Sequence, residues 1–385
     1  MNSKKVTLLF RKFNQFNPTI KQLLMIITCL FSAFSGNSTL AQLTPDQTLG
    51  TENSTIRENL QVKGALADVI EGGAIRNSNL FHSFSEFNIN ELQRVYFANP
   101  TEINNIFTRV TGENPSHIFG TLGVNGSANL YLLNPHGFVF GENAQLDITG
   151  SFTATTADSV IFNNFNYSAI NPEAPPLLNI SVPLGLQYGN AQNAGIINTG
   201  NLKVGTGSIL SLFAGTVINT GQLLAPEGQV IIATFPNLNN NNNSLSELIN
   251  YGNNNNNLGL TINSNGEVIL DDSIVENGDI LIKGETRKSS IETGNLTLLS
   301  ANNITLLETE LLTSGDLNLL AFDTVKIRDS LINPINIQAG GNLSIQGNQG
   351  IDILALNHPN TPFQSGGNLS LISDGIISGD AHFAS

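Results

Sequence analysis

One short motif limits what this chain can fold into: Gly, then Asn or Asp, then Leu or Ile, repeated along its second half. The copies are Gly200–Leu202, Gly278–Ile280, Gly294–Leu296, Gly315–Leu317, Gly341–Leu343 and Gly367–Leu369. From Gly278 onward they start 16, 21, 26 and 26 residues apart, and the later copies lead into alternating apolar and polar residues. A period of about 20–25 residues with no helical pattern predicts a β-solenoid.

The composition agrees with stacked coils of short strands. One coil cannot bury its own apolar face, so coils must stack, with about three strands in each. Inward Leu, Ile, Val and Phe would alternate with outward Ser, Thr, Asn and Asp. Charged residues make up only 12% of the chain, and its 36 Gly suit many tight turns. We therefore predict an all-β parallel solenoid of roughly twelve to fifteen coils, at a rise of about 4.8 Å per coil.

Residues 1–41 have the pattern of a signal peptide. Five basic residues precede the mostly apolar run Leu23–Phe34, and Thr39–Ala41 is a plausible cleavage site. The alternative, a membrane anchor, is disfavoured because that run is shorter than the roughly 20 residues that a spanning helix needs. The only cysteine, Cys29, lies in this segment, so the mature chain could form no disulfide.

The charge balance excludes polyanions as partners. The net charge is −14, and removal of residues 1–41, which hold five basic and no acidic residues, would make it −19. A surface of that sign repels nucleic acid and anionic lipid. We therefore expect no nucleic-acid partner.

The least polar part of the chain contains a predicted strand–turn–strand unit. Leu130–Leu133 and Phe138–Phe140 flank the turn Asn134–Gly137. Pro135 fixes φ at one position of the turn, and Gly137 can adopt a positive φ without steric cost. Two short strands joined by a tight turn are expected here.

Two stretches interrupt the regular pattern. Phe162–Pro183 is rich in Pro and should be a loop or an excursion from the regular body. Asn239–Asn243 and Asn253–Asn257 are runs of Asn, which are typical of exposed insertions. We assign residues 236–258 to an Asn-rich insertion without a function.

No residue pattern in the chain indicates catalysis, a cofactor or a metal. The five His are scattered without metal-ligand spacing: His82, His117, His136, His358 and His382. Asp271-Asp272, the only adjacent carboxylate pair, fits a solvated turn better than an acid–base or Ca²⁺ site. Gly205-Thr206-Gly207 lacks the rest of a dinucleotide fingerprint and is a turn. We therefore predict no catalytic, cofactor or metal site, and a protein that is not an enzyme.

Six motifs occur in a fixed order between Glu71 and Gly141. They are Glu71–Gly73, Asn79–Phe84, Thr108–Gly112, Pro115–Leu122, Asn125-Gly126 and Leu133–Gly141. Together they resemble the haemagglutination-activity domain at the N-terminus of filamentous haemagglutinin-like exoproteins, and are most similar to its cyanobacterial branch. The resemblance covers residues 42–235.

The resemblance implies two-partner secretion by a Gram-negative-type bacterium. In this family the Sec machinery exports the chain to the periplasm. An outer-membrane barrel transporter with periplasmic recognition domains then passes it out unfolded. Outside, the N-terminal domain folds as a right-handed parallel β-helix with an N-terminal cap and extra-helical loops, and it templates the following coils. The exported protein acts at the cell surface as an adhesin or haemagglutinin towards a host or cell-surface glycan or protein.

The resemblance also divides the chain. Residues 1–41 would be the signal peptide, and residues 42–235 the two-partner secretion domain. The Asn-rich insertion 236–258 would separate that domain from β-helix repeat coils at 259–385. Because no polar cap follows the last coil, we expect the array to be truncated.

Recognition by the transporter is assigned, through the resemblance, to residues of two segments. They are Arg109, Val110, Thr111, Gly112, Asn134, Pro135, Gly137 and Phe138. The family's motif is Asn-Pro-Asn-Gly-like, and His136 stands where Asn is usual. A second family motif, Asn-Pro-Asn-Leu, has only a partial counterpart at Asn99–Glu102.

Two alternatives compete with the exoprotein interpretation. A β-helical carbohydrate-active enzyme, a lyase or a hydrolase, would need several carboxylates that converge on one outer face. A self-exporting autotransporter would need a C-terminal barrel of alternating strands, which this sequence lacks.

Overall fold

The computed structural model describes residues 43–177, 183–189, 194–235, 260–262, 268–270, 277–284, 290–356 and 361–385. Within these ranges every regular element is a β-strand. The same ranges contain no helix long and apolar enough to cross a membrane. The predicted signal peptide and Asn-rich insertion lie outside the described residues, as do Asp271-Asp272 and His358.

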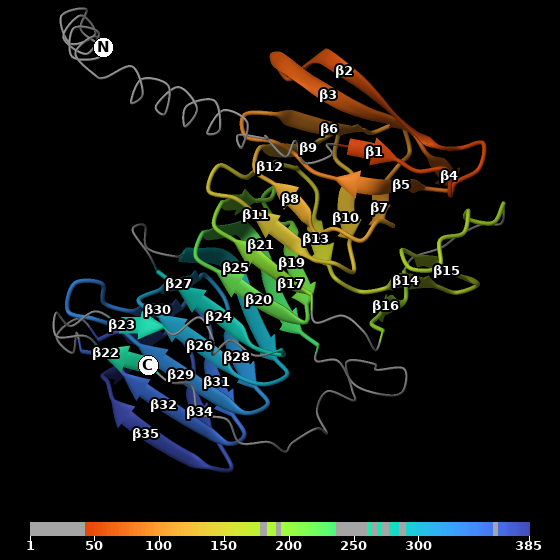
Figure 1. Ribbon diagram of the computed structural model, residues 1–385. Helices are drawn as coiled ribbons and strands as arrows, with labels where there is room; N and C mark the ends of the chain where they lie inside the picture. Colours follow the sequence, from red (N-terminus) through yellow and green to blue (C-terminus); the bar gives the residue numbers. More distant parts are fainter. Residues whose placement is uncertain are drawn as a thin grey trace, which may run out of the picture. The chain divides into compact units, whose positions relative to one another are not determined.

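Parallel strands stack in three columns, and successive coils add strands to each column (Figure 1). The first column is a nine-stranded sheet: β8 (Ser116–Ile118), β11 (Phe138–Phe140), β17 (Gly195–Asn198), β20 (Thr216–Asn219), β24 (Ile280–Lys283), β26 (Ile304–Leu307), β29 (Thr324–Arg328), β32 (Gly350–Leu354) and β35 (Ile376–Asp380). The predicted all-β parallel β-helix with three strands per coil is therefore confirmed.

The other two columns belong to one large sheet that bends around the coil. The second column contains β5 (Asn79–Phe87), β7 (Asn105–Val110), β10 (Asn129–Leu133), β13 (Phe152–Thr155), β19 (Ile209–Ala214), β28 (Leu317–Ala321), β31 (Leu343–Gly347) and β34 (Leu369–Ile372). The third contains β3 (Ala65–Gly72), β6 (Arg94–Ala98), β9 (Thr121–Asn125), β12 (Gln145–Asp147), β18 (Asn201–Lys203), β27 (Glu310–Thr313), β30 (Asn336–Ala339), β33 (Phe363–Ser365) and β36 (Phe383–Ala384). Two long strands, β21 (Gln222–Thr234) and β25 (Ser290–Ser300), run through both columns.

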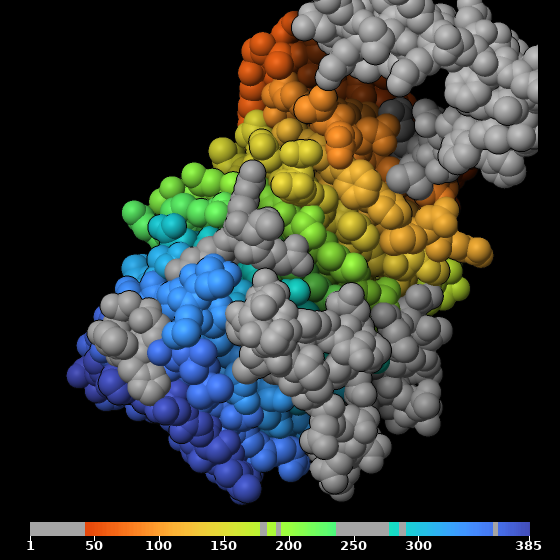
Figure 2. Space-filling view, turned by 60° about the vertical axis from the view of Figure 1, so that its left-hand side comes forward, coloured from red at the N-terminus to blue at the C-terminus, as the bar shows by residue number. Residues whose placement is uncertain are grey.

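The register of the second column explains the sequence repeat. Leu296 pairs with Leu317, Leu317 with Leu343, and Leu343 with Leu369, so the Leu of each motif occupies the same point of its coil. Consecutive coils follow one another along the surface in chain order (Figure 2). The first column has nine strands in the described residues, fewer than the twelve to fifteen coils predicted. Strands β1–β7 and the excursion after β13 add no strand to this column.

One apolar core fills the inside of the coils. In the second column Leu80, Ile106, Leu130 and Phe152 lie directly above one another, and each is at most 1% exposed. Because side chains alternate along a strand, the neighbours of these residues point outward. Full burial of such a side chain stabilises the fold by about 1.5–3 kcal/mol.

An antiparallel cap precedes the first coil. The hairpin of β2 (Ser54–Val62) and β3 extends the third column, because β3 pairs in parallel with β6. The short strands β1 (Leu43–Pro45) and β4 (Ala74–Arg76) both pair with β5 in antiparallel fashion. These strands cover the edge that a bare first coil would expose.

An excursion after β13 forms a sheet of its own. β14 (Ser159–Phe162), β15 (Phe165–Ser168) and β16 (Gly185–Gln187) make a three-stranded antiparallel sheet beside the second column (Figure 1). The sequence predicts a loop or an excursion from the regular body at residues 162–183, and the structure shows an excursion. Residues 165–168 are a strand rather than irregular, because a tight turn at Asn163-Asn164 starts a hairpin. The remaining strands, β22 (Leu260–Ile262) and β23 (Val268–Leu270), pair with each other in antiparallel fashion.

Candidate functional site

The predicted recognition residues lie at neighbouring corners of two successive coils. β7 and β10 are parallel and in register, with Arg109 opposite Leu133. The corner after β7 therefore stacks on the corner after β10. The structure thus brings together the two segments that the sequence singles out, Arg109–Gly112 and Asn134–Phe138.

The Asn134 side chain holds the corner after β10. It is fully buried, and its Nδ2 donates to the Asn114 carbonyl and to Ser116 Oγ, both at 3.0 Å. Its Oδ1 accepts the backbone N–H of His136 at 2.9 Å, while its carbonyl accepts the N–H of Gly137 at 3.0 Å. One amide therefore closes the turn and ties it to the preceding coil, which a shorter or apolar side chain would not do.

Steric constraints explain the other residues of this turn. Pro135 is buried, and Phe138 is 1% exposed and points into the core. Gly137 has φ +103°, and a Cβ there would lie 2.6 Å from the carbonyl oxygen of Gly195. The predicted positive φ at Gly137 is confirmed, and no other residue fits this position without displacing the next coil.

His136 departs from the family motif without disturbing the turn. Its backbone N–H bonds to Asn134, and its side chain is half-buried. The turn therefore uses only the backbone at position 136, so it tolerates His in place of Asn. Burial raises the pKa of the Asp158 carboxyl, and the electrostatic effect of His136 opposes that rise.

Arg109 is fully buried and joins three distant parts of the chain. Its Nε donates to Ser83 Oγ at 2.9 Å, Nη1 to the Ser168 carbonyl at 2.9 Å, and Nη2 to Thr48 Oγ1 at 2.8 Å. Its guanidinium also lies 4.4 Å from the centre of the Tyr167 ring. A buried guanidinium charge is stable inside a protein only when hydrogen-bond acceptors or aromatic rings surround it, as they do here.

Asp46 supplies the negative charge that complements Arg109, through shared hydroxyl groups. Its carboxylate accepts hydrogen bonds from Thr48 Oγ1 at 2.6 Å, Thr111 Oγ1 at 2.7 Å and Ser83 Oγ at 2.8 Å. Burial alone would raise the pKa of Asp46, but the hydrogen bonds from Thr48, Thr111 and Ser83 outweigh it and lower that pKa below its usual value. Asp46 therefore stays ionised at neutral pH.

The remaining predicted residues of this segment are structural in the folded chain. Val110 is 1% exposed and belongs to the core. The Thr111 N–H donates to the Phe84 carbonyl at 2.7 Å. Gly112 packs directly on the Ser85 carbonyl, where a Cβ would overlap with it.

The partial second motif forms another corner of the same kind. Asn99 Nδ2 donates to the Ile103 carbonyl at 3.0 Å, and Asn99 Oδ1 accepts the N–H of Ala128 on the next coil at 2.9 Å. Ile103 N–H in turn donates to the Pro100 carbonyl at 3.2 Å. Both Asn-Pro sequences therefore place a buried or half-buried amide between successive coils.

Sequence reasoning missed a second buried arginine, Arg76. It is 7% exposed, and its Nη1 and Nη2 donate to both carboxylate oxygens of Glu52, at 3.0 and 2.7 Å. It also donates to the Pro175 carbonyl at 2.8 Å and the Pro176 carbonyl at 2.7 Å. The hydrogen bonds from Arg76 lower the pKa of Glu52. No local pattern around Arg76 indicates partners so far along the chain.

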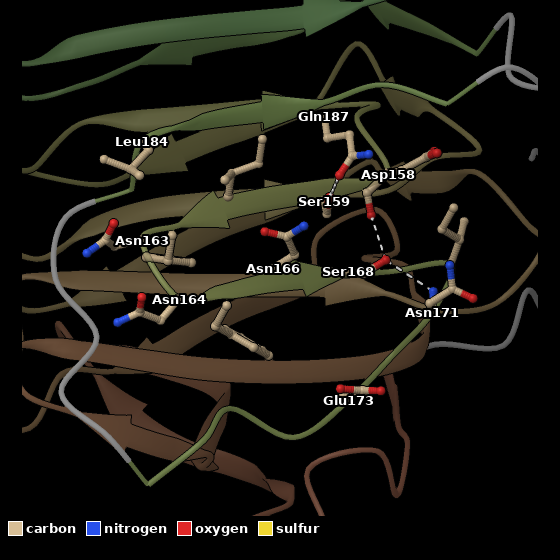
Figure 3. Close-up of a pocket in the computed structure, with 14 residues that line it drawn as sticks. Asp158, Ser159, Asn163, Asn164, Asn166, Ser168, Asn171, Glu173, Leu184 and Gln187 are labelled. Atoms are coloured by element: carbon tan, nitrogen blue, oxygen red, sulfur yellow. Dashed lines mark hydrogen bonds between the residues drawn. The ribbon is translucent and has the colours of Figure 1, made fainter. Parts of the chain in front are cut away.

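A cavity of about 700 Å³ lies beside the β14–β15–β16 sheet (Figure 3). Amide and hydroxyl side chains predominate in its lining: Ser159, Asn163, Asn164, Asn166, Ser168, Asn171 and Gln187. Asp158 and Glu173 also line it, but Asp158 precedes β14 and Glu173 follows β15, and the two lie apart (Figure 3). Glycoside cleavage needs two carboxyl groups that flank one bond, and this cavity offers no such pair. Among the residues with described positions, no three or more His, Cys, Asp or Glu are grouped to hold a metal ion.

Comparison with known proteins gives one family and two partial relatives. The family model of the TPS secretion domain matches residues 41–284. A heme/hemopexin-binding protein of Haemophilus influenzae is 39% identical over 72 residues, which are 19% of this chain and 8% of that protein. A second heme/hemopexin-binding protein of H. influenzae is 36% identical over 75 residues, or 20% of this chain and 8% of that protein. The chain thus spans only a small part of the length of these relatives.

Two solved structures are similar to most of the chain. The crystal structure of the filamentous hemagglutinin secretion domain is 13% identical, with a TM-score of 0.43, over 89% of this chain and 97% of that one. The HMW1 secretion domain from H. influenzae is 18% identical, with a TM-score of 0.37, over 87% of this chain and 91% of that one.

Proposed function

Because the chain belongs to the family of TPS secretion domains, we propose that it directs the export of a two-partner secretion exoprotein. The Sec machinery delivers the chain to the periplasm. There, the recognition domains of an outer-membrane barrel transporter bind Arg109–Gly112 and Asn134–Phe138. The bound chain is unfolded, and it folds only after it leaves the transporter.

The observation that carries this proposal is the burial of the recognition residues. In the folded chain Arg109 and Asn134 are fully buried, and Val110 and Phe138 are each 1% exposed. A transporter could not reach these side chains on the folded coils. If the transporter recognises these side chains, it does so before the chain folds. The same side chains then close the corners of the β-helix.

Folding outside the cell would make export one-way. Each coil that forms buries the apolar side chains that face the core and adds a parallel strand to the columns, which stabilises the exported part of the chain. The described residues form their core without a disulfide, because the only cysteine is Cys29 in the predicted signal peptide. The corner residues Asn134 and Gly137 belong to the segment that forms the earliest coils and templates the rest.

The exoprotein itself is proposed to act at the surface of a Gram-negative-type bacterium, of cyanobacterial type, as a non-catalytic adhesin. Its target would be a glycan or a protein on a host or a neighbouring cell. Family membership and the repeated coils support this role, because stacked coils offer a long surface for binding.

The secretion proposal is tested by substitution of corner residues in a cell that makes the partner transporter. We expect Asn134→Ala and Gly137→Pro each to lower the amount of secreted protein at least tenfold, at unchanged transcript level. Immunoblots of the culture medium and of the periplasm measure the effect.

A matched control separates recognition from folding. Asn198 is also fully buried at a corner, where its Oδ1 accepts the N–H of Gly200 at 3.1 Å, but it lies outside both predicted segments. Asn198→Ala should lower secretion less than twofold. Equal losses for Asn134→Ala and Asn198→Ala would mean that both corners act through folding alone, and recognition of Asn134 would be ruled out.

A further inference from the structure

One excursion covers a column of aromatic side chains that a plain β-helix would expose. Phe81, Phe107 and Tyr131 face outward from β5, β7 and β10, and their rings stack at centroid distances of 5.4 and 4.6 Å. We call these three residues the aromatic column, and residues 157–177, which contain β14 and β15, the strap. Phe162 and Tyr167 of the strap pack edge-on against Phe81 at 5.7 and 4.9 Å.

Two buried arginines fasten the strap to the coils. Arg109 binds its middle, through the Ser168 carbonyl and the ring of Tyr167. Arg76 binds its end, through the carbonyls of Pro175 and Pro176. In both cases the arginine binds backbone carbonyls, and Arg109 also contacts the Tyr167 side chain.

The same two arginines also hold the N-terminal segment, residues 43–53. Arg76 makes the bidentate ion pair with Glu52. Arg109 bonds to Thr48 directly and reaches Asp46 through Ser83.

An apolar contact adds to these polar ones. Leu49, only 2% exposed, shares an apolar cluster with the strap residues Val160, Phe162, Tyr167 and Ala169. The N-terminal segment and the strap, which are more than a hundred residues apart in sequence, thus meet over one group of side chains.

We propose that the N-terminal segment and the strap form one latch. Each part packs stably in its place by the aromatic column only while the other part is also bound. Without Glu52, Arg76 would be a buried cation with only carbonyl partners, and without the strap it would lose those carbonyls. A buried charge that lacks part of its partners is strongly disfavoured, so each part stabilises the other through the shared arginine. While the N-terminal segment is held elsewhere, the strap stays open and the aromatic column is accessible.

Hydrogen exchange of the folded full-length chain tests the latch. Glu52→Gln and Asp46→Asn change side chains that make no hydrogen bond to the strap. We nevertheless expect each to speed amide exchange in residues 159–168 about tenfold, which is within the usual range of coupling between sites. Residues 317–354 should exchange at the wild-type rate. The matched control is Glu71→Gln, which removes a carboxylate that pairs with exposed Arg57 in the same cap and should leave the strap unchanged.

The coupling is reciprocal, which gives a second test that leaves the N-terminal segment intact. Tyr167→Leu removes the ring beside Arg109 and should speed exchange in residues 43–53 by a similar factor. Faster exchange in residues 43–53 with an unchanged strap in Glu52→Gln would overturn the proposal, because the two parts would then close independently. Uniformly faster exchange, including residues 317–354, would also overturn it. The test is made on purified protein, so its result does not depend on whether the secretion proposal holds.

Discussion

The coils of residues 290–385 and the region of residues 43–235 follow one backbone path but are held by different contacts. In the later coils one contact recurs: Asn295 Oδ1 accepts the N–H of Asp316 at 2.9 Å, and Asn342 Oδ1 accepts the N–H of Asn368 at 3.0 Å. The earlier region has a ladder of amide side chains, in which Asn105 bonds to Asn79 and Asn129, and also unique clusters around its buried arginines. One recurring contact is therefore enough to hold the later coils together, whereas the earlier region is also held by contacts that each occur once.

The two cores differ in the same way. The described coils of residues 290–385 bury mainly Leu, Ile, Val and Ala among their apolar side chains, with Phe363 as the one buried ring. The earlier region buries large rings: Phe81, Phe84, Phe87, Tyr96, Phe97, Phe107, Phe138, Phe140, Phe152 and Tyr167. A ring fills a particular space, while stacked aliphatic side chains are interchangeable from coil to coil. We therefore expect the earlier region to depend more strongly on single residues, and the following predictions test that difference.

The largest effect should come from Arg109→Met. This change leaves the Ser168 carbonyl without the Arg109 donor and removes the buried charge that complements the half-buried Asp46 carboxylate. We therefore expect a loss of about 3–5 kcal/mol in the free energy of unfolding. Urea unfolding followed by circular dichroism at pH 7 measures it. The control, Arg57→Met, removes an arginine from an exposed pair with Glu71 and should cost at most about 0.5 kcal/mol. Similar losses for both would show that the Arg109 cluster is no more important than a surface ion pair.

The next effect concerns Gly137 at the corner after β10. Gly137→Ala forces a Cβ to within 2.6 Å of the Gly195 carbonyl oxygen at φ +103°, and we expect a loss of about 3 kcal/mol. Gly207 is a matched control, because its φ is +77° and a Cβ there meets nothing within 4 Å. Gly207→Ala should cost only about 1 kcal/mol. An equal loss at both positions would assign the effect to φ alone rather than to the close approach of the next coil.

The sequence predicts the repeated part of this fold because the signal is local. Gly and Asn at a fixed spacing mark each corner, and the Leu of each motif meets the Leu of the next. The turn Asn134–Gly137 was predictable for the same reason, since Pro and Gly act on their own φ. The positive φ at Gly137 follows directly from this chemistry.

The clusters around the arginines were not predictable, because their partners are remote in sequence. Arg109 bonds to residues 26, 59 and 61 positions away, and Arg76 to carbonyls 99 and 100 positions away. Nothing in the neighbouring sequence indicates these distances. The hairpin of the excursion was missed because its alternating residues lie next to a Pro-rich stretch. Recognition of Arg109 and Asn134 by the transporter stays a prediction, since the folded structure shows only where these residues lie.

The third effect is on pH dependence and involves His82 in β5. His82 is fully buried, its Nδ1 lies 3.0 Å from Ser54 Oγ, and burial lowers its pKa to about 3. Because the folded pKa lies below the unfolded value of about 6.5, stability falls as the pH drops below 6.5, by about 2 kcal/mol between pH 7 and 5. His82→Asn should remove most of this dependence, as measured by urea unfolding at several pH values. An unchanged slope in this variant would show that another group titrates in that window.

The smallest effect should come from a single rung of the ladder in the later coils. Asn342 Nδ2 donates to Asp316 Oδ1 at 3.1 Å, and its Oδ1 accepts from Asn368. Asn342→Ala removes two exposed hydrogen bonds, so we expect a loss of about 1 kcal/mol, with faster amide exchange only in the neighbouring coils. The outward-facing Asn318, in register with Ser344, is the control, and Asn318→Ala should change stability by at most about 0.5 kcal/mol. A loss for Asn342→Ala as large as that for Arg109→Met would contradict the contrast between the two regions, because one rung among similar ones would then matter as much as a unique cluster.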